Sequence, residues 1–555
     1  MRTVVEAIVE RAGGAGALTV LGSGGQQTTT TPWRAVHDQA RRMSAVLARG
    51  GLGPGSRVGF LAETGTDLVA ALQAAWLAGA SITVLAPPAG GASRTRPDHL
   101  LAVVADAGLD LVVVDAALGS AGPALSAATR VLPLALLADQ AEATAPAVPY
   151  RPDPADLAVL QYTSGSTRSP RGVPVTHGHL AANIEAIKVA IDHDAAHPSR
   201  ALSWLPLYHD MGLIGFLALP MSCGCPLVLQ SPAAFARRPA GWLEAVSALN
   251  IAVTAAPNFA YGLMTRLRTA GLDVDLRSVR LMLSGGEPVN AGMMARFVAA
   301  ARSYGLDPAA IVPAYGLAES TLAVTFSPLG AGIRVDRVDP YALETEGRAV
   351  PAVPGGPTRQ LVRVGRPVPG TSLRIVDRHT GDPVGERTVG DVEISGPSVV
   401  GHYWGDTRPP PGSWSRTGDL GYLAGGELVV CGRESDVLFA AGRNVFPQDI
   451  EAAAGEVPGV RPGGVAAFGV PAEHGDRLVV VVESRGSDPA TVRRQVAAAV
   501  LGEVGLRPSE VVTLTFGRLP RTSSGKLRRA EARRRYLSAD SAATPPIHLE
   551  KGTQR

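Results

Sequence analysis

The sequence has no long apolar run, although 46% of its 555 residues are hydrophobic. A membrane-spanning helix needs ~18 or more consecutive apolar residues, whereas the Ala, Val and Leu residues here are spread over short runs. The first six residues already contain an acidic side chain and lack the apolar core of a signal peptide. These absences argue against a membrane span and predict a soluble cytoplasmic protein.

Cysteine is also scarce, with only Cys223, Cys225 and Cys431 in the chain. That number is too small for a disulfide framework at this length, and it fits a reducing compartment. The pair around Gly224 is compatible with redox or metal chemistry. It lies within an apolar stretch, residues 217–229, so we expect buried core thiols, and no metal cluster is evident from the sequence.

Excess charge of one sign is missing as well. The net charge is +3, and basic and acidic residues are interspersed, which does not indicate a nucleic-acid partner. A run of arginines near the C-terminus is the exception, and its helical spacing favours a solvated face or a docking patch. Its members are Arg528, Arg529, Arg533, Arg534 and Arg535.

The length predicts two or more domains, since one domain usually spans ~50 to 250 residues. Apolar runs typical of strands alternate with amphipathic helical segments. This pattern predicts an α/β fold with largely parallel sheets flanked by helices, and ligands of such sheets bind beyond the carboxyl ends of the strands. The expected strands are 57–62, 81–86, 110–115, 157–162, 201–205, 226–230, 251–256 and 280–284.

The pattern changes after residue 338. Residues 338–363 are rich in Pro, Gly and charge, and predict an irregular insertion. Short strands separated by turn residues predict a β-rich subdomain over about 364–430, and a second alternation of strands and helices follows. We therefore predict an N-terminal domain of residues 1–432, a small mobile α+β domain of residues 433–537, and a flexible tail, 538–555.

Residues 162–173 place hydroxyls, glycines and arginines on one loop behind an apolar strand. Hydroxyls and glycine-exposed N–H groups can donate to several phosphate oxygens at once. A Walker A loop would need Gly-x-x-x-x-Gly-Lys-Ser/Thr, but Gly525-Lys526 is followed by Leu527. A Ser/Thr/Gly run by itself is more often a solvated loop, so other segments of the chain are needed to support phosphate binding here.

Five more segments follow in a fixed order: 204–212 (WLPLYHDMG), 284–288 (SGGEP), 314–320 (AYGLAES), 416–420 (RTGDL), and 431–433 (CGR) with 523–526 (SSGK). With this order the chain resembles the adenylate-forming superfamily of acyl-CoA synthetases, peptide-synthetase adenylation domains and luciferases, over nearly its whole length. It is most similar to the fatty acyl-AMP ligases. Arg168 and Arg171 stand where acyl-CoA synthetases usually have Gly and Lys, and residues 338–363 lie where that subgroup carries its insertion.

The resemblance implies an ATP- and Mg²⁺-dependent ligase that converts a carboxylic acid, expected to be a fatty acid, into an acyl adenylate and releases pyrophosphate. The acyl group is then expected to pass to the thiol of an acyl carrier protein, in bacterial secondary metabolism. The insertion of this subgroup is thought to hinder the domain rotation that CoA thioesterification needs.

The resemblance also implies roles for individual residues. Lys526, delivered by the small domain, would bridge the carboxylate and the α-phosphate as charge develops. Glu319, with Thr163, would hold Mg²⁺ through hard oxygen ligands, and His209 would gate the acyl site or orient the substrate. The expected nucleotide-binding residues are Thr163, Ser164, Gly165, Ser166, Thr167, Gly285, Gly286, Glu287, Tyr315, Gly316, Asp419 and Arg433.

Each of these residues also has an ordinary structural interpretation. Glu319 alone fits a helix N-terminal carboxylate, His209 a core histidine, and Lys526 a solvated loop lysine. The sequence also departs from the superfamily: Ser435, beside Asp436, occupies the usual hinge position of an Asp or Lys. The chain therefore stands on a side branch, and its acid need not be a long-chain fatty acid.

Three other functions stay open at this stage. An acyl-CoA synthetase would share the ATP motifs and release acyl-CoA. An activator of small or aromatic acids, including a diazotase that uses nitrite, would differ in pocket volume. A non-catalytic nucleotide-binding protein is expected to have lost Lys526 or Glu319, and both are present.

Overall fold

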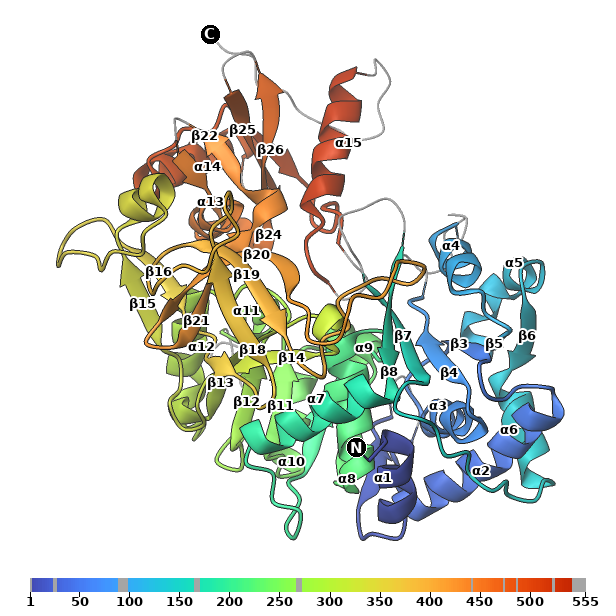
Figure 1. Cartoon of the computed structure of the whole chain (residues 1–555). Coiled ribbons are helices and arrows are strands. Elements are labelled where there is room, and N and C mark those ends of the chain that lie inside the picture. The colour runs from blue at the N-terminus through green and yellow to red at the C-terminus, as the bar shows by residue number, and fades with distance from the viewer. Residues whose placement is uncertain are drawn as a thin grey trace.

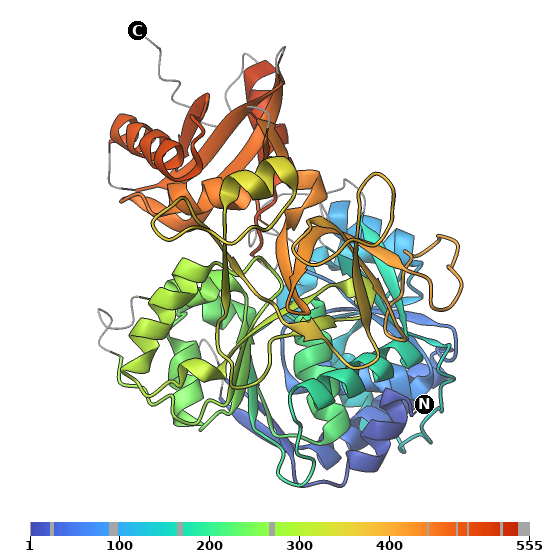
Figure 2. The same ribbon diagram turned by 60° about the vertical axis from the view of Figure 1, so that its left-hand side comes forward.

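The computed structural model describes residues 2–22, 27–87, 98–163, 170–265, 272–440, 443–472, 475–485, 488–521 and 525–541. Two mainly parallel sheets form the larger part of the molecule, and the C-terminal elements, orange to red, lie above them (Figure 1). The turned view in Figure 2 shows the same separation of the C-terminal elements from the rest. Within the described ranges, no helix is both long and apolar enough to cross a bilayer.

The first sheet has six strands among the described residues, in the order β6-β5-β3-β4-β7-β8. All neighbours pair in parallel except β7 and β8. In β5, Leu111 and Val113 face one core and Val112 and Val114 face another, because successive side chains of a strand point to opposite faces. Its strands are β3 (Arg57–Leu61), β4 (Ser81–Val84), β5 (Leu111–Val114), β6 (Arg130–Pro133), β7 (Leu157–Thr163) and β8 (Arg171–Thr176).

The second sheet has nine strands in the described part of the chain, in the order β17-β14-β13-β12-β11-β9-β10-β1-β2. The strands from β13 to β1 pair in parallel, and β2, β14 and β17 are antiparallel at the edges. Its strands are β1 (Ala17–Val20), β2 (Thr29–Pro32), β9 (Ala201–Ser203), β10 (Leu227–Leu229), β11 (Val253–Ala256), β12 (Leu281–Ser284), β13 (Ile311–Gly316), β14 (Ala323–Phe326) and β17 (Arg366–Pro367).

One hydrophobic core joins the two sheets. It contains side chains of β3 and β11 together with those of α3 (Thr66–Ala78), which is buried from Leu68 to Leu77. The other helices of this part are α1 (Val4–Arg11), α2 (Trp33–Arg49), α4 (Asp98–Ala107), α5 (Gly122–Ser126), α6 (Leu134–Glu142), α7 (His177–Ala190), α8 (Leu219–Cys223), α9 (Pro232–Arg237), α10 (Gly241–Ala248), α11 (Asn258–Met264) and α12 (Ala291–Arg302). Short helical turns are η1 (Ala116–Ala121), η2 (Met211–Ala218), η4 (Pro308–Ala310) and η5 (Ala318–Ser320).

The expected β-rich unit is an antiparallel sheet of β18 (Ser372–Val376), β19 (Gly390–Ser395), β20 (Ser415–Ala424) and β21 (Glu427–Arg433). The sequence predicted an irregular insertion over residues 338–363, but part of this segment has regular structure. It contains a helical turn, η6 (Ala342–Glu346), and β16 (Arg359–Val362), which pairs antiparallel with β15 (Val335–Val338). The prediction was wrong here because these strands carry charged residues whose partners lie elsewhere in the chain.

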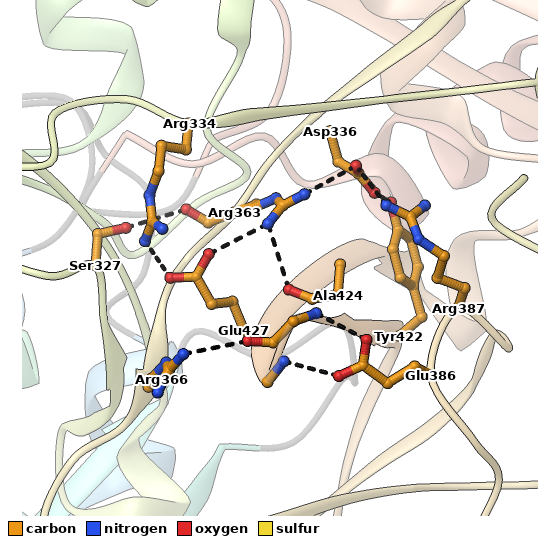
Figure 3. Close-up of polar contacts among 12 residues, drawn as sticks. Ser327, Arg334, Asp336, Arg363, Arg366, Glu386, Arg387, Tyr422, Ala424 and Glu427 are labelled. Atoms are coloured by element: carbon orange, nitrogen blue, oxygen red, sulfur yellow. Dashed lines mark hydrogen bonds and ion pairs between the residues drawn. The ribbon is translucent and has the colours of Figure 1, made fainter. Parts of the chain in front are cut away.

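Those partners form a buried charge network (Figure 3). Asp336 of β15 accepts hydrogen bonds from Arg363 at 3.2 Å, from Arg387 at 3.0 Å and from the Tyr422 hydroxyl at 2.7 Å. Glu427 at the start of β21 lies 3.5 Å from Arg363. Buried carboxylates are tolerated when cations and hydrogen bonds compensate them, and this network fixes the β15–β16 pair to the β-rich sheet.

The C-terminal part has a sheet of β24 (Val460–Ala472), β25 (Gly475–Ser484) and β26 (Glu510–Leu514), preceded by η7 (Glu434–Asp436) and the pair β22 (Leu438–Ala440) and β23 (Arg443–Val445). Alternate side chains of β25 enter two cores. Val480 packs with α13 (Pro447–Gly455) and α14 (Pro489–Val504), and Val481 packs with α15 (Arg529–Ser541).

The predicted fold class is confirmed, including a smaller C-terminal α+β domain. The exact boundaries of the predicted domains stay a prediction. The tail differs from expectation at its start, since α15 continues through Ser541, and residues 542–555 lie outside the described residues.

Candidate functional site

A cavity of about 2220 Å³ brings most of the predicted site residues together. Strands β9, β11, β12 and β13 are parallel, so their carboxyl ends meet at one edge of the sheet, and the segments that follow them line this cavity. The C-terminal domain contributes the opposite wall. The predicted residues in the lining are His209, Gly285, Gly286, Glu287, Tyr315, Gly316, Glu319, Asp419, Arg433 and Lys526.

The hydroxyl-rich loop is the exception. Thr163 ends β7 and pairs with Arg171 of β8. The other predicted loop residues, Ser164, Gly165, Ser166 and Thr167, lie outside the described residues. The phosphate and metal contacts expected of this loop, Thr163 included, stay a prediction.

Three groups from three strands, β13, β20 and β21, form the polar wall of the cavity. The Tyr315 hydroxyl donates to Asp419 Oδ2 at 2.6 Å, and Arg433 Nε lies 3.3 Å from Asp419 Oδ1. The pairing of β20 with β21 places Asp419 opposite Arg433. Burial raises the pKa of Asp419, although Arg433 and Tyr315 oppose that shift. This carboxylate is therefore held in place by the Tyr315 hydroxyl and the Arg433 guanidinium.

Glu319 follows β13 on the turn η5, and its carboxylate accepts a hydrogen bond of 2.6 Å from the hydroxyl of Tyr403. Burial and the nearby Glu319 raise the pKa of Tyr403 to about 12, so this phenol remains a hydrogen-bond donor at neutral pH. The guanidinium of Arg171 lies 3.6 Å above the Tyr403 ring. Tyr403 was not identified from the sequence, because it lies 84 positions from its partner Glu319.

His209 lies two residues before the π-helical turn η2, a kind of helix irregularity that is frequent at functional sites. Its Nδ1 is 2.7 Å from Asp210 Oδ1. Burial alone would raise the pKa of Asp210, but the charges of His209 and Lys526 outweigh it and the pKa is lowered. Asp210 was missed as a site residue, although it is the neighbour of His209 in the quoted segment.

Lys526 reaches this cavity from the C-terminal domain. A β-carbon placed at Gly286 would lie 3.9 Å from Lys526 Nζ, so the ammonium stands beside the glycine turn after β12. Burial lowers the pKa of Lys526, while the carboxylates of Asp210 and Glu287 counteract that effect. The ammonium is thus surrounded by groups from the N-terminal part of the chain.

Backbone geometry explains why glycine occupies two positions of the site. Gly286 has φ of +80°, which favours glycine. At Gly316, a β-carbon would lie 2.0 Å from the carbonyl oxygen of Leu322, so no larger residue fits.

Glu287 accepts a hydrogen bond of 2.7 Å from the Phe259 N–H, and burial raises the pKa of Glu287.

Apolar side chains form another part of the cavity lining. Met211 and Phe216 of η2 and Phe259 of α11 are among its residues. Behind them the rings of Trp204 and Phe235 stack with centroids 3.6 Å apart. One part of the cavity is therefore apolar and another part is charged.

The insertion contacts the C-terminal domain directly. Arg359 of β16 pairs with Asp449 of α13 at 3.0 Å, donates to the carbonyl oxygen of Cys431 at 3.0 Å, and lies 4.4 Å from the centre of the Phe446 ring. Arg359 is only 7% exposed. We call it the buried clamp, because its side chain connects the insertion to the C-terminal domain. The sequence did not identify this residue, because its partners are distant in the chain.

Comparisons with known proteins agree with this geometry. The model of the AMP-binding enzyme family matches residues 5–404. A putative ligase of Mycobacterium tuberculosis is 41% identical over 90% of this chain and 93% of its own length. The long-chain-fatty-acid–AMP ligase FadD26 of Mycobacterium bovis is 36% identical over 91% of each chain.

Solved structures give the same picture. One comes from studies of fatty acyl-adenylate ligases of E. coli and L. pneumophila, with TM-score 0.88, 34% identity and coverage of 98% of this chain and 99% of that one. A second is a fatty acyl-adenylate ligase of L. pneumophila in complex with acyl adenylate and pyrophosphate, with TM-score 0.72, 26% identity and coverage of 97% and 96%.

Proposed function

The chain belongs to the AMP-binding enzyme family, and we propose that it activates a fatty acid as an acyl adenylate. A carboxylate oxygen attacks the α-phosphorus of ATP. The bond between this phosphorus and the oxygen that bridges the α- and β-phosphates breaks, and pyrophosphate leaves with that oxygen. The relatives named fatty acid–AMP ligases and the apolar part of the cavity support a fatty acid as the substrate.

The observation that carries this proposal is the position of Lys526. Its ammonium stands beside Gly286, in the same cavity as the Tyr315–Asp419–Arg433 group. A cation fixed where negative charge develops stabilises a phosphoryl-transfer transition state without reorganisation at the moment of reaction. In this arrangement Asp419 accepts the ribose hydroxyls, Tyr315 flanks the adenine, and Lys526 bridges the two reacting anions.

The residues present also fit Mg²⁺. Glu319 offers a carboxylate on the cavity wall, and the Tyr403 hydroxyl holds one of its oxygens; hard oxygen ligands of this kind suit the ion. When bound by Glu319, with Thr163 as the second expected ligand, the ion would neutralise phosphate charge. Tyr403 would orient the carboxylate for that task.

We further propose that the acyl group is transferred to the thiol of an acyl carrier protein rather than to CoA. The buried contacts of Arg359 with Asp449 and Phe446 support this choice, because they oppose rotation of the C-terminal domain away from its present position. The cysteines, which are all free, are consistent with a reducing cytoplasm.

The test uses the purified full-length protein with ATP, Mg²⁺ and a panel of fatty, aromatic and small inorganic acids, each with and without CoA or a carrier protein bearing phosphopantetheine. Mass spectrometry identifies the products, and pyrophosphate release gives the rate. Acyl-AMP that persists in the presence of CoA, and is consumed by the carrier protein, is the expected result. Acyl-CoA formation would refute the choice of acceptor, and turnover only with an aromatic acid or nitrite would refute the choice of acid.

A further inference from the structure

Three potential metal ligands meet at the C-terminal ends of helices α7 and α8, apart from the groups used by the proposed reaction. Single ligand atoms of His193, Cys223 and Cys225 all lie within 4.8 Å of one another. His193 follows α7, Cys223 ends α8, and Cys225 follows it after Gly224. The sequence was compatible with metal chemistry at the cysteine pair but favoured buried core thiols, because His193 is far from the cysteines in the chain.

The two cysteines are fixed by the end of a helix. Gly224 has φ of +68° and caps α8, and the N–H of Cys225 donates to the Pro220 carbonyl oxygen at 2.8 Å. The Trp33 indole donates to the Cys225 carbonyl oxygen at 2.7 Å. A β-carbon at Gly16 would lie 2.0 Å from the Gly224 oxygen, so the turn is also tightly packed. The spacing of the two sulfurs therefore comes from a rigid backbone.

The third ligand is fixed by the end of another helix. The N–H of His193 donates to the carbonyl oxygen of Lys188 at 2.9 Å, one turn back in α7. Asp192, just before it, has φ of +50°, which turns the chain sharply at this point. Two independent helix ends thus point an imidazole and two thiols at one another.

A small cavity of about 70 Å³ adjoins this cluster and is lined by His193 and Cys223. That volume exceeds the ~10 to 15 Å³ needed to hold a water molecule. His193 and Cys225 also line the large cavity, so the cluster lies where the two cavities approach each other. Three protein ligands beside a space large enough for water match a tetrahedral site that keeps one position for a water ligand.

We propose that His193, Cys223 and Cys225 form a binding site for a borderline or soft metal ion, for which Zn²⁺ is the best match. Two sulfurs and one imidazole nitrogen select Zn²⁺ or Cu⁺ over Mg²⁺ and Ca²⁺, which require oxygen ligands. Zn–S bonds of ~2.3 Å and Zn–N bonds of ~2.0 Å place tetrahedral ligands less than 4 Å apart. Ligand atoms already within 4.8 Å reach that spacing by small side-chain movements.

The site is independent of the adenylation chemistry, so its test does not use activity. The full-length protein, reduced and freed of metal, is titrated with Zn²⁺ alone in competition with a chromophoric chelator. Co²⁺ in place of Zn²⁺ reports thiolate ligation through its sulfur-to-metal absorption bands. We expect one Zn²⁺ per chain, thiolate bands with Co²⁺, and a higher melting temperature with Zn²⁺, because the ion binds the folded state.

Variants identify the ligands. His193→Gln, at a partly exposed position, and Cys223→Ser should each weaken Zn²⁺ binding by more than about tenfold, since even residues behind metal ligands change affinity 10- to 100-fold. Cys431→Ser is the matched control, because that buried thiol lies outside the cluster, and it should bind Zn²⁺ as the parent does. Stoichiometric binding that survives both ligand substitutions, or no binding by the parent protein, would overturn the proposal.

Discussion

Replacing Lys526 with alanine tests the central step of the proposed reaction. The change removes the one cation that the C-terminal residues 525–541 place beside Gly286, while Tyr315, Asp419 and Arg433 stay in position. We expect acyl-adenylate formation to fall by about 10² to 10³, as after loss of an oxyanion-hole donor, with the affinity for ATP nearly unchanged.

The magnitude follows from the geometry. The ammonium lies 3.9 Å from the point where a β-carbon at Gly286 would stand. For a reacting anion about 4 Å from the ammonium, the attraction is about 4 kcal/mol at an effective dielectric of about 20. Part of this attraction is already present in the ground state, because the acid and the phosphates are anionic before they react. A loss of about 2.7 to 4 kcal/mol in the transition state corresponds to the stated rate factor.

The assay measures pyrophosphate release with the acid that the panel identifies, and ATP affinity by equilibrium binding without acid. The control is Arg535→Ala, which removes a half-exposed cation of α15 that pairs only with Glu531 among its described contacts. The control should turn over like the parent. Unchanged pyrophosphate release in Lys526→Ala, or a loss explained entirely by weaker ATP binding, would refute the role of the ammonium.

Three further changes test neighbouring contacts. Tyr403→Phe removes the hydroxyl that holds Glu319, and it should raise the Mg²⁺ concentration needed for half-maximal pyrophosphate release several-fold while the maximal rate at saturating Mg²⁺ is nearly kept; an unchanged Mg²⁺ requirement would contradict the orienting role. Arg359→Ala removes the buried clamp of the C-terminal domain, and acyl-CoA should become detectable by mass spectrometry where the parent forms only acyl-AMP; a product mixture identical to the parent's would show that the clamp does not select the acceptor. Burial raises the pKa of Glu344 to about 7, above its ordinary value of 4.5. The neutral carboxyl therefore stabilises the fold fully below its ordinary pKa of 4.5, and this contribution is lost as the pH rises through about 7. Denaturant unfolding at pH 5 and pH 8 should therefore show a smaller loss of stability for Glu344→Gln than for the parent, and equal losses would contradict the shifted pKa.

Most of the fold was predictable because its strands are short apolar runs bounded by turn residues. The pattern failed at β15 and β16, where Asp336 and Arg359 are buried in strands. Burying a charge is costly unless a partner compensates it, and the partners here, Arg363 and Asp449 among them, come from other parts of the chain. A local reading of hydrophobicity cannot detect a strand that tertiary ion pairs stabilise.

The same reason limits the prediction of the site. Glu319 and Lys526 were identified because they belong to ordered motifs, and the structure places both at one cavity. Tyr403 belongs to none of these motifs and is found only through its contact with Glu319. Asp210 lies within the segment 204–212, but its role is evident only from its pairing with His209 and from the effect of the Lys526 charge on its pKa. The proximity of His193 to the two cysteines became evident only from the positions of two helix ends in the structure.

The position of Lys526 also links the charge of the site to the position of the C-terminal domain. Its ammonium is balanced by Asp210 and Glu287, which belong to the N-terminal part. Arg529, three residues later, instead pairs at 2.7 Å with Glu451 and with Asp436 beside the expected hinge. Movement of this domain would separate the ammonium from Asp210 and Glu287, whereas the pairs of Arg529 would move with the domain. The proposed reaction therefore predicts that the anions of ATP and the acid favour this position of the C-terminal domain most, and that release of pyrophosphate weakens the attraction that retains Lys526.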